Sequence, residues 1–176
     1  EKKGNIVSIL PRLNALIRPT VSNIDQALII FAVAEPKPNF GLLDRFLVMM
    51  ARQHIPTVIC FNKKDIGSAA ETKILSETYA GCGCPVLFAS VKEESGIDAV
   101  REVLLGRTTV LAGPSGVGKS SLMNLLNPKA RMETGAVSEK IKRGRHTTRH
   151  SEIFYLGSDS YLMDTPGFTS LYIQDM

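Results

Sequence analysis

Thr108-Thr-Val-Leu-Ala112 runs directly into Gly113-Pro-Ser-Gly-Val-Gly-Lys-Ser120, and this junction of an apolar run with a glycine-rich loop decides the fold. The apolar run predicts a buried strand, and the residues from Lys119 to Leu126 predict a helix that Asn127-Pro128 closes. A strand, a GxxxxGKS loop and a helix in this order are typical of a phosphate-binding loop. A chance glycine-rich turn is the alternative, and the Lys-Ser pair in this frame argues against it.

The loop assigns a chemical role to most of its residues. Its glycines let successive backbone N–H groups point at phosphates, at the positive end of the following helix. Lys119 is expected to reach the β- and γ-phosphates, and the Ser120 hydroxyl is expected to bind Mg²⁺. Taken alone, the loop indicates a nucleoside triphosphate and leaves the base open. The candidate phosphate-binding residues are Gly113, Pro114, Ser115, Gly116, Val117, Gly118, Lys119, Ser120 and Ser121.

A second polar motif, Asn62-Lys63-Lys64-Asp65, follows the predicted strand Pro56–Phe61. Open α/β sheets bind ligands at the carboxyl ends of their strands, which is where this motif lies. The Asp65 carboxylate can accept both N1–H and the 2-amino group of guanine, a pair of bonds that adenine cannot form. Asn62 is expected to support the loop and the base edge, and the stem of Lys63 to cover the ring. By itself the motif is a common polar turn, but beside the phosphate loop it favours guanine.

Two further positions complete the predicted nucleotide site. Ala89-Ser90 follows the next predicted strand, where we expect a backbone N–H to meet the guanine oxygen. Asp164-Thr-Pro-Gly167 ends the predicted strand Tyr161–Met163. Asp164 is expected to hold Mg²⁺ through a water, and the Gly167 N–H to sense the γ-phosphate. An Asp-initiated Pro-Gly turn is the alternative for this last motif.

The stretch Gly144-Arg-His-Thr-Thr-Arg149 lies where a first switch segment belongs. A threonine hydroxyl there would complete the Mg²⁺ shell, and we expect Thr148 to supply it, with Thr147 as the second choice. Phe168 follows Gly167, where many GTPases place a glutamine that orients the attacking water. His146 is therefore the candidate catalytic residue for positioning water. The alternative is that His146 is simply a solvated switch residue.

Composition sets the broad class. The chain has 176 residues with 44% hydrophobic and 22% charged residues, which favours one main soluble domain. No apolar run approaches the roughly 18 residues that a membrane helix needs, so no membrane association is expected. The formal net charge is only +4, but basic residues crowd one short stretch. Such a run is either a solvated loop or a site that attracts phosphate or RNA. Its members are Lys140, Lys142, Arg143, Arg145 and Arg149.

The three cysteines are odd in number and fit a reducing, cytoplasmic setting. Cys60 lies in an apolar run, where we expect it to pack as a small hydrophobic residue. Cys82-Gly-Cys84 has the spacing of half a metal site. No second Cys or His pair at ligand spacing accompanies it, so the sequence favours an unliganded turn.

Strand and helix patterns alternate along the chain, which predicts an α/β fold with a mostly parallel sheet. The segment Ser151–Leu156 with Ser160–Met163 predicts a hairpin, the one antiparallel edge. Residues 1–18 differ: Gly4–Pro11 predicts a short strand left from a preceding β domain, and Pro19 marks the boundary of the main domain, 19–176. The other predicted strands are Gln26–Val33, Pro56–Phe61, Pro85–Ala89, Thr108–Ala112 and Tyr161–Asp164, and the predicted helices are Leu42–Gln53, Glu71–Tyr79, Ile97–Leu105 and Lys119–Leu126.

The three motifs stand in a rotated order. An ordinary GTPase reads phosphate loop, switch and base motif, whereas here the base motif comes first and the Asp164 motif last. In this order, and in stretches such as Leu10-Pro11-Arg12, Leu42-Leu-Asp-Arg-Phe46 and Asp164-Thr-Pro-Gly-Phe168, nearly the whole chain resembles the RsgA family, also known as YjeQ or YloQ. These are circularly permuted P-loop GTPases that assist maturation of the small ribosomal subunit.

The resemblance implies hydrolysis of GTP to GDP and phosphate with Mg²⁺, stimulated by the 30S subunit, with nucleotide state governing release from 16S rRNA. It implies an N-terminal OB-fold, of which residues 1–18 would be the tail, a permuted GTPase domain over 19–176, and a C-terminal zinc domain. Nothing in this chain follows Met176 to supply Zn²⁺ ligands, so none is named. A monomer is the expected state.

Two other functions compete with this one. A guanylate kinase has a closely similar phosphate loop, but normally near its N-terminus and with no need for the motifs at Asn62 or Asp164. A non-enzymatic, nucleotide-gated module that binds the ribosome or RNA is favoured by Phe168 in place of glutamine. Formation of GDP from GMP and ATP identifies the kinase, and ribosome-accelerated turnover separates the GTPase from the binding module.

Overall fold

Six strands form one sheet in a computed structural model of the protein, which describes residues 7–16, 20–127 and 152–164. The strand order is β3-β2-β1-β4-β6-β5, and every neighbouring pair is parallel except the β5–β6 hairpin. The predicted parallel sheet with one antiparallel edge is therefore confirmed. The strands are β1 (Gln26–Ala32), β2 (Thr57–Asn62), β3 (Val86–Phe88), β4 (Thr108–Ala112), β5 (Glu152–Gly157) and β6 (Ser160–Asp164).

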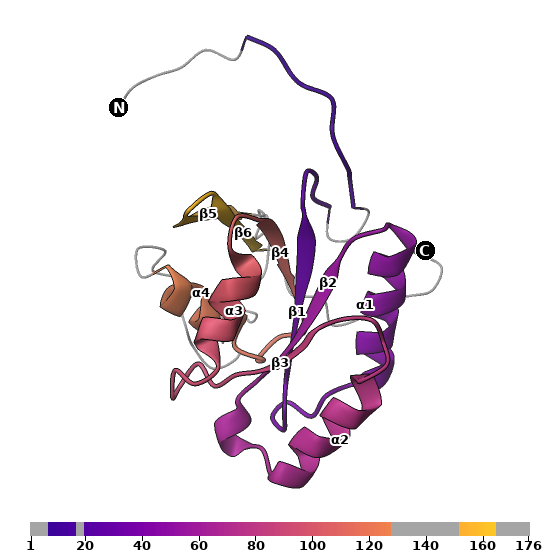
Figure 1. The fold of residues 1–176 in the computed structure, drawn as a ribbon, viewed down its shortest axis with the longest axis vertical. Helices are drawn as coiled ribbons and strands as arrows, with labels where there is room; N and C mark the ends of the chain where they lie inside the picture. The colour runs from indigo at the N-terminus through magenta and orange to yellow at the C-terminus, as the bar shows by residue number, and fades with distance from the viewer. Residues whose placement is uncertain (1–6, 17–19, 128–151, 165–176) are drawn as a thin grey trace, which may run out of the picture.

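Helices cover both faces of this sheet (Figure 1). Helices α1 (Phe40–Arg52) and α2 (Ala69–Tyr79) pack on one face, and α3 (Ile97–Leu104) and α4 (Lys119–Leu126) pack on the other. A short 3₁₀ helix, η1 (Lys64–Ile66), lies between β2 and α2. Because the helices shield both faces, the central strands are apolar throughout rather than alternating.

Strand β1 is the centre of the fold. All seven of its residues are buried, and it pairs with β2 along one edge and with β4 along the other. Ile29 and Phe31 join the core under α1 and α2, while Leu28 and Ile30 join the core under α3 and α4. The alternating side chains of one strand thus connect the two halves of the hydrophobic core.

Two helices begin earlier than the sequence predicted, because polar caps extend them. Asn39 accepts a hydrogen bond from the Leu42 N–H at 3.0 Å, so α1 starts at Phe40. Ser68 and Glu71 form a capping box in which each side chain bonds the other's backbone N–H, so α2 starts at Ala69.

The chain changes direction across the sheet between β1 and β4. From β1 it continues through α1 to β2 and β3 on one side, and β4 returns to the other side of β1. The helix that follows β1 lies on one face, and the helix that follows β4 lies on the opposite face. Loops that leave adjacent strands toward opposite faces open a crevice at the carboxyl ends of those strands, the common ligand position in open α/β sheets.

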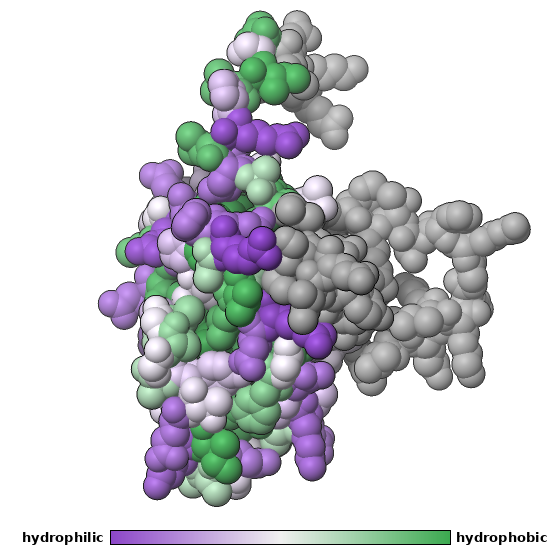
Figure 2. Space-filling view, turned by 90° about the vertical axis from the view of Figure 1, so that its right-hand side faces the viewer, coloured by the Kyte–Doolittle hydropathy of each residue, from purple (hydrophilic) through white to green (hydrophobic). Residues whose placement is uncertain are grey.

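The N-terminal segment carries no strand in its described part, residues 7–16. Val7, Ile9, Leu10 and Leu13 are each at least 79% exposed. Its first residues, 7–12, extend away from the sheet in Figure 1, and their apolar side chains lie clear of the body at the top of Figure 2, whereas Leu16 is back in the core at 3% exposed. The strand predicted over Gly4–Pro11 is therefore absent from residues 7–11, because a strand needs a partner and no described segment pairs with these residues. Across the described ranges, no helix is both long and apolar enough to cross a membrane.

Replacing Phe46 by alanine tests the α1 layer of the core. The Phe46 ring is fully buried and lies edge-on to Phe31, with ring centroids 6.5 Å apart. We expect the free energy of unfolding to fall by about 3–5 kcal/mol in urea titrations, because the truncation leaves a cavity. Val48→Ala is the matched control on the same helix: Val48 is 50% exposed, and its loss should change stability by less than about 0.5 kcal/mol. Equal losses for both variants would contradict this packing.

Candidate nucleotide-binding site

The glycine-rich loop connects β4 to α4 in a shape that only glycine permits at two points. Gly113 has φ +149°, and a Cβ there would collide with the Ile30 carbonyl oxygen of β1. Gly118 has φ +97° and stands as the N-cap of α4, and its Cβ would collide with the Asn62 side-chain amide. These contacts press the loop against β1 and β2, so the two outer glycines are needed for close packing as well as for the turn.

Lys119, the first residue of α4, folds back over the loop. Its Nζ donates to the carbonyl oxygens of Gly113 at 2.7 Å and Pro114 at 2.6 Å. Burial lowers the pKa of Lys119 below its ordinary value, and the negative charge of Asp164 partly opposes this shift. A largely desolvated ammonium group at a helix N-terminus favours an anionic partner, as predicted for a phosphate-binding lysine.

Asn62, the last residue of β2, joins three loops through one side chain. It is only 3% exposed. Its Nδ2 donates to the Val117 carbonyl at 2.9 Å, and its Oδ1 accepts from the Val91 N–H at 3.1 Å. The first bond reaches the phosphate loop and the second reaches the segment after β3. Asn62 therefore sets the distance between the phosphate loop and the base motif.

The base motif turns sharply after Asn62. Lys63 has φ +62° and ψ +36°, a left-handed conformation that starts η1, and its Nζ donates to the Glu35 carbonyl at 2.8 Å. Asp65, inside η1, accepts a 2.6 Å hydrogen bond at Oδ1 from the Ser90 hydroxyl. The Ser90 hydroxyl oxygen in turn accepts from the Glu93 N–H at 3.1 Å. The Asp65 carboxylate is thus held in one orientation by a residue from the next strand's loop.

A pocket of about 320 Å³ opens between these loops. It brings together the predicted residues Asn62, Lys63 and Asp65 from the base motif with Gly118 and Ser121 from the phosphate-loop side. It is also lined by residues that the sequence analysis did not assign, namely Ile66, Val91 and Lys92. The sequence carried no signal for these three beyond their position next to predicted residues.

The expected backbone donors at Ala89-Ser90 are already used within the protein. The Ala89 N–H donates to the Phe61 carbonyl and the Ser90 N–H to the Ser95 carbonyl, both at 2.9 Å. Ser90 contributes its hydroxyl instead, through Asp65. The residues after β3 that line the pocket are the next two along the chain, Val91 and Lys92. The Ala89 N–H is used because Ala89 still continues the ladder between β3 and β2.

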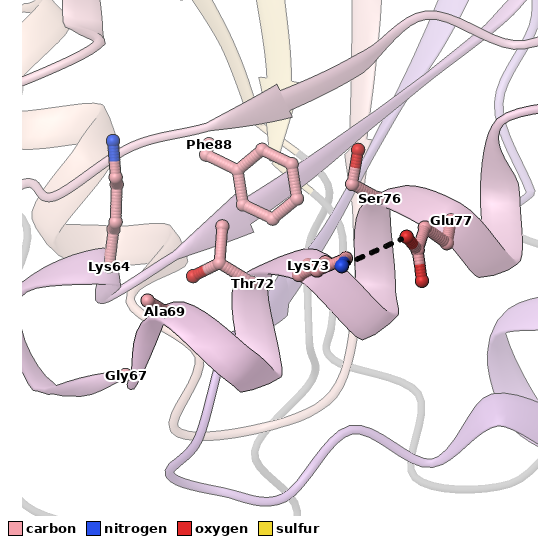
Figure 3. A pocket seen from close by; sticks show the side chains of 8 residues that line it. All are labelled: Lys64, Gly67, Ala69, Thr72, Lys73, Ser76, Glu77 and Phe88. Atoms are coloured by element: carbon pink, nitrogen blue, oxygen red, sulfur yellow. Dashed lines mark ion pairs between the residues drawn. The ribbon is translucent and has the colours of Figure 1, made fainter.

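Lys64 lines a different hollow. Its side chain borders a shallow cavity of about 670 Å³ between β3 and α2, with Phe88 on one side and Thr72 and Ser76 on the other (Figure 3). This hollow lies on the α2 side of the base motif and includes no residue of the phosphate loop. The structure thus separates Lys64 from Lys63 and Asp65, although the three are adjacent in sequence.

The candidate magnesium ligands are only partly described. Asp164 ends β6 opposite Leu111 of β4, and its charge acts on Lys119, so it lies near the phosphate loop. Ser120 is half-buried in the first turn of α4. A serine hydroxyl and a carboxylate are oxygen donors of the kind that Mg²⁺ prefers, so these residues fit the ion. Gly167, Thr147, Thr148 and the candidate catalytic His146 lie outside the described residues, as does the basic run at 140–149.

The chain is similar in sequence and in structure to known proteins. A family model described as RsgA GTPase matches residues 9–174. The chain is 58% identical over 168 residues, 96% of its length, to a protein from Agathobacter rectalis named small ribosomal subunit biogenesis GTPase RsgA. It is similar in structure to YjeQ from Thermotoga maritima, with a TM-score of 0.74 and 32% identity over 92% of this chain and 54% of that one.

A second solved structure, described as YloQ, a circularly permuted GTPase, matches all of this chain and 56% of its own, with a TM-score of 0.73 and 34% identity. The chain also spans only 56% of the Agathobacter rectalis protein. It therefore corresponds to a little over half the length of the relatives it matches.

Asn62→Ala should lower the free energy of unfolding more than most other substitutions at this site. It leaves the Val117 carbonyl and the Val91 N–H without their partner in a buried setting, and we expect the free energy of unfolding to fall by about 2–4 kcal/mol. Asn39→Ala is the matched control, because it removes one helix cap and should cost about 1 kcal/mol. Chemical denaturation of both variants makes the comparison. An Asn62→Ala loss no larger than that of Asn39→Ala would refute the bridging role.

Proposed function

The chain belongs to the RsgA GTPase family, and on that premise we propose that it binds guanine nucleotide at the carboxyl edge of β4, β1 and β2 and hydrolyses GTP to GDP and phosphate. The proposal rests above all on one arrangement. The oriented Asp65 carboxylate and the phosphate loop border the same crevice, and the buried Asn62 amide fixes the spacing between them. A nucleotide needs both, because its base and its phosphates must be bound at the same time.

Recognition of guanine follows from the chemistry of Asp65. Its carboxylate is an acceptor with two oxygens, and guanine presents two adjacent donors, N1–H and the 2-amino group. Ser90 holds the carboxylate at Oδ1, and Lys63 is held by the Glu35 carbonyl, so its aliphatic stem forms a fixed wall of the pocket. Because the Val91 N–H already donates to Asn62 Oδ1, the Lys92 backbone is the part of the pocket that would meet the guanine oxygen.

The phosphate side of the site is supported by charge and by the helix terminus. The N–H groups at the start of α4 and the Lys119 ammonium would bind the β- and γ-phosphates, with Lys119 exchanging its carbonyl partners for phosphate oxygens. Ser120 would bind Mg²⁺ directly and Asp164 through a water. When bound, Mg²⁺ offsets the negative charge that develops on the transferred phosphoryl group.

Hydrolysis itself is assigned from the sequence. Thr148 is proposed to complete the magnesium shell, and the Gly167 N–H to respond to the γ-phosphate. Phe168 has no polar group with which to orient water, so His146 is proposed to position the attacking water. In the sequence, His146 and Thr148 precede β5, and Gly167 and Phe168 follow β6, which ends at Asp164.

The proposed partner is the small ribosomal subunit. Support comes from the name of the relative in Agathobacter rectalis, a small ribosomal subunit biogenesis GTPase. We propose that the basic run meets phosphates of 16S rRNA, in a cytoplasmic monomer whose residues 1–18 end an OB-fold and whose residues 19–176 form the permuted GTPase domain. A zinc domain would lie beyond this chain. Among the described residues, no group of three or more His, Cys, Asp or Glu side chains is placed to hold a metal.

Asp65→Asn tests the base specificity. An amide replaces one acceptor oxygen with a donor, so we expect GTP binding to weaken about 10- to 100-fold. Xanthosine triphosphate carries an oxygen in place of the 2-amino group, so its affinity should rise relative to that of GTP. Asp98→Asn, an exposed change in the first turn of α3, is the matched control and should leave the ratio unchanged. An unchanged GTP-to-XTP ratio in Asp65→Asn would remove Asp65 from base recognition.

GTP turnover with and without purified small ribosomal subunits tests the proposed activity. We expect the subunits to accelerate GTP turnover. The His146→Ala variant should lower the accelerated rate about 10²-fold or more and still bind nucleotide. Binding of the subunits in a GTP-dependent manner without accelerated turnover would instead support the nucleotide-gated binding module. Formation of GDP from GMP and ATP would support the guanylate kinase.

A further inference from the structure

The turn between α2 and β3 carries two cysteines that the nucleotide site does not use. Cys82 is exposed and Cys84 is half-buried, against the core beneath α1 and α2. The Cys82 N–H donates to the Tyr79 carbonyl at 3.2 Å, which fastens the turn to the last residue of α2. Tyr79 is itself fixed by its hydroxyl bond to Asp44 and by packing against Phe61. The two thiols are therefore carried on an anchored turn.

The turn brings the two thiols together. The Cys82 Sγ lies 3.8 Å from the Cys84 carbonyl oxygen, to which it donates, and Cys82 is near enough to raise the pKa of the Cys84 thiol. Gly83 between them has φ +76°, a left-handed conformation that curls the backbone, and no atom beyond its two chain neighbours lies within 4 Å of the position where its Cβ would be. The Cys82 side chain is thus turned toward the Cys84 backbone and is open to solvent.

Metal binding does not fit this pair. A structural zinc site needs four ligands, and the described residues hold no group of three or more His, Cys, Asp or Glu side chains so placed. The third cysteine offers a contrast. Cys60 is 1% exposed in β2, and burial raises its pKa to about 12, so its thiol is inert. The chain therefore contains one protected thiol and one pair of neighbouring thiols of which Cys82 is exposed.

We propose that Cys82 and Cys84 form a redox-responsive dithiol, which a low-molecular-weight disulfide converts reversibly into an intramolecular disulfide. The inference goes beyond the proposed GTPase function and does not depend on it. Thiol–disulfide exchange requires one accessible thiol and a second thiol within its reach, and Cys82 with Cys84 two positions along the same turn supplies both. In reducing compartments such disulfides are transient and serve in catalysis or redox sensing rather than in folding.

The exchange proceeds in two balanced steps. The exposed Cys82 thiolate attacks one sulfur of the small disulfide, which breaks the S–S bond, forms a mixed disulfide and releases one small thiolate. Cys84 then loses its proton and attacks the Cys82 Sγ, which forms the Cys82–Cys84 bond and releases the second small thiolate. The two protein thiols are oxidised, the small disulfide is reduced to two thiols, and the protons pass to the solvent or the leaving thiolates.

Burial and the neighbouring thiol set the order of these steps. Desolvation raises the pKa of Cys84, and the Cys82 charge raises it further, so Cys84 ionises after Cys82 has been capped. The ring closed by cysteines two residues apart is short, so the bond is strained and easily reduced again. Both features favour a reversible switch over a permanent crosslink.

Alkylation in glutathione buffers tests the proposal. The reduced chain is equilibrated at increasing ratios of oxidised to reduced glutathione, quenched with iodoacetamide, and analysed by intact mass and peptide mapping. We expect Cys82 and Cys84 to become protected from iodoacetamide together as the ratio rises. The oxidised chain should have a mass about 2 Da below that of the unalkylated reduced chain, because two thiol hydrogens are lost. The chain should remain unlinked to other chains, and excess reduced glutathione should restore both thiols.

The single variants provide the discriminating comparison. Cys82→Ser and Cys84→Ser should each accumulate one glutathione on the remaining cysteine, since no partner resolves the adduct. Cys82→Ser changes only an exposed side chain, so it is informative even if Cys84→Ser folds poorly. Cys60→Ala should leave the wild-type pattern unchanged. Three results would each overturn the proposal. They are stable glutathione adducts on the wild-type chain, disulfides between chains, and wild-type thiols that still react with iodoacetamide under conditions in which the variants form adducts.

Discussion

The buried side chain of Asn62 is the interaction on which the rest of the site depends. Its amide meets the Val117 carbonyl on one side and the Val91 N–H on the other, and thereby spans loops that follow β2, β3 and β4. Gly118 is what lets the amide come so close, because any side chain there would occupy the same space. The distance between the phosphate loop and the base pocket is thus fixed by one residue pair rather than by the loops separately. The sheet supplies the frame: β1 lies between β2 and β4 and holds their ends in register.

Much of this structure can be predicted from the sequence, because it rests on local patterns. The bounds of β4 and α4 follow from an apolar run, a glycine-rich loop and a closing Asn-Pro, all contiguous in the chain. Helix starts were less accurate, since Asn39 and Ser68 act as caps from outside the apolar pattern. The lone strand predicted near the N-terminus is absent from residues 7–11, because an apolar run predicts a strand but cannot supply the neighbour with which it must pair.

The finer features of the site depend on contacts between distant residues, which a sequence pattern does not encode. Asn62 and Val117 are 55 positions apart, so the shared hydrogen bond could not be predicted from either motif. Ala89 and Ser90 stand at the predicted place, but the sheet ladder and the Ser95 bond consume their N–H groups. Lys63 and Lys64 look equivalent in the sequence. Only the left-handed turn at Lys63 sends one to the base pocket and the other to the hollow beside α2.

The central position of β1 also orders events during synthesis on the ribosome. Strands β1, β2 and β3 emerge early and pair across connections that each hold one α-helix, so one half of the sheet can assemble while the remainder is still being translated. The other edge of β1 stays open until β4 emerges, and the Gln26–Thr109 hydrogen bond across that seam spans 83 positions. Closing so long a loop is slow, and an open apolar edge invites pairing with other chains. Strand β2, which leads into the base motif, is thus expected to pair first. The phosphate loop follows β4, so it becomes ordered only when β4 pairs with β1.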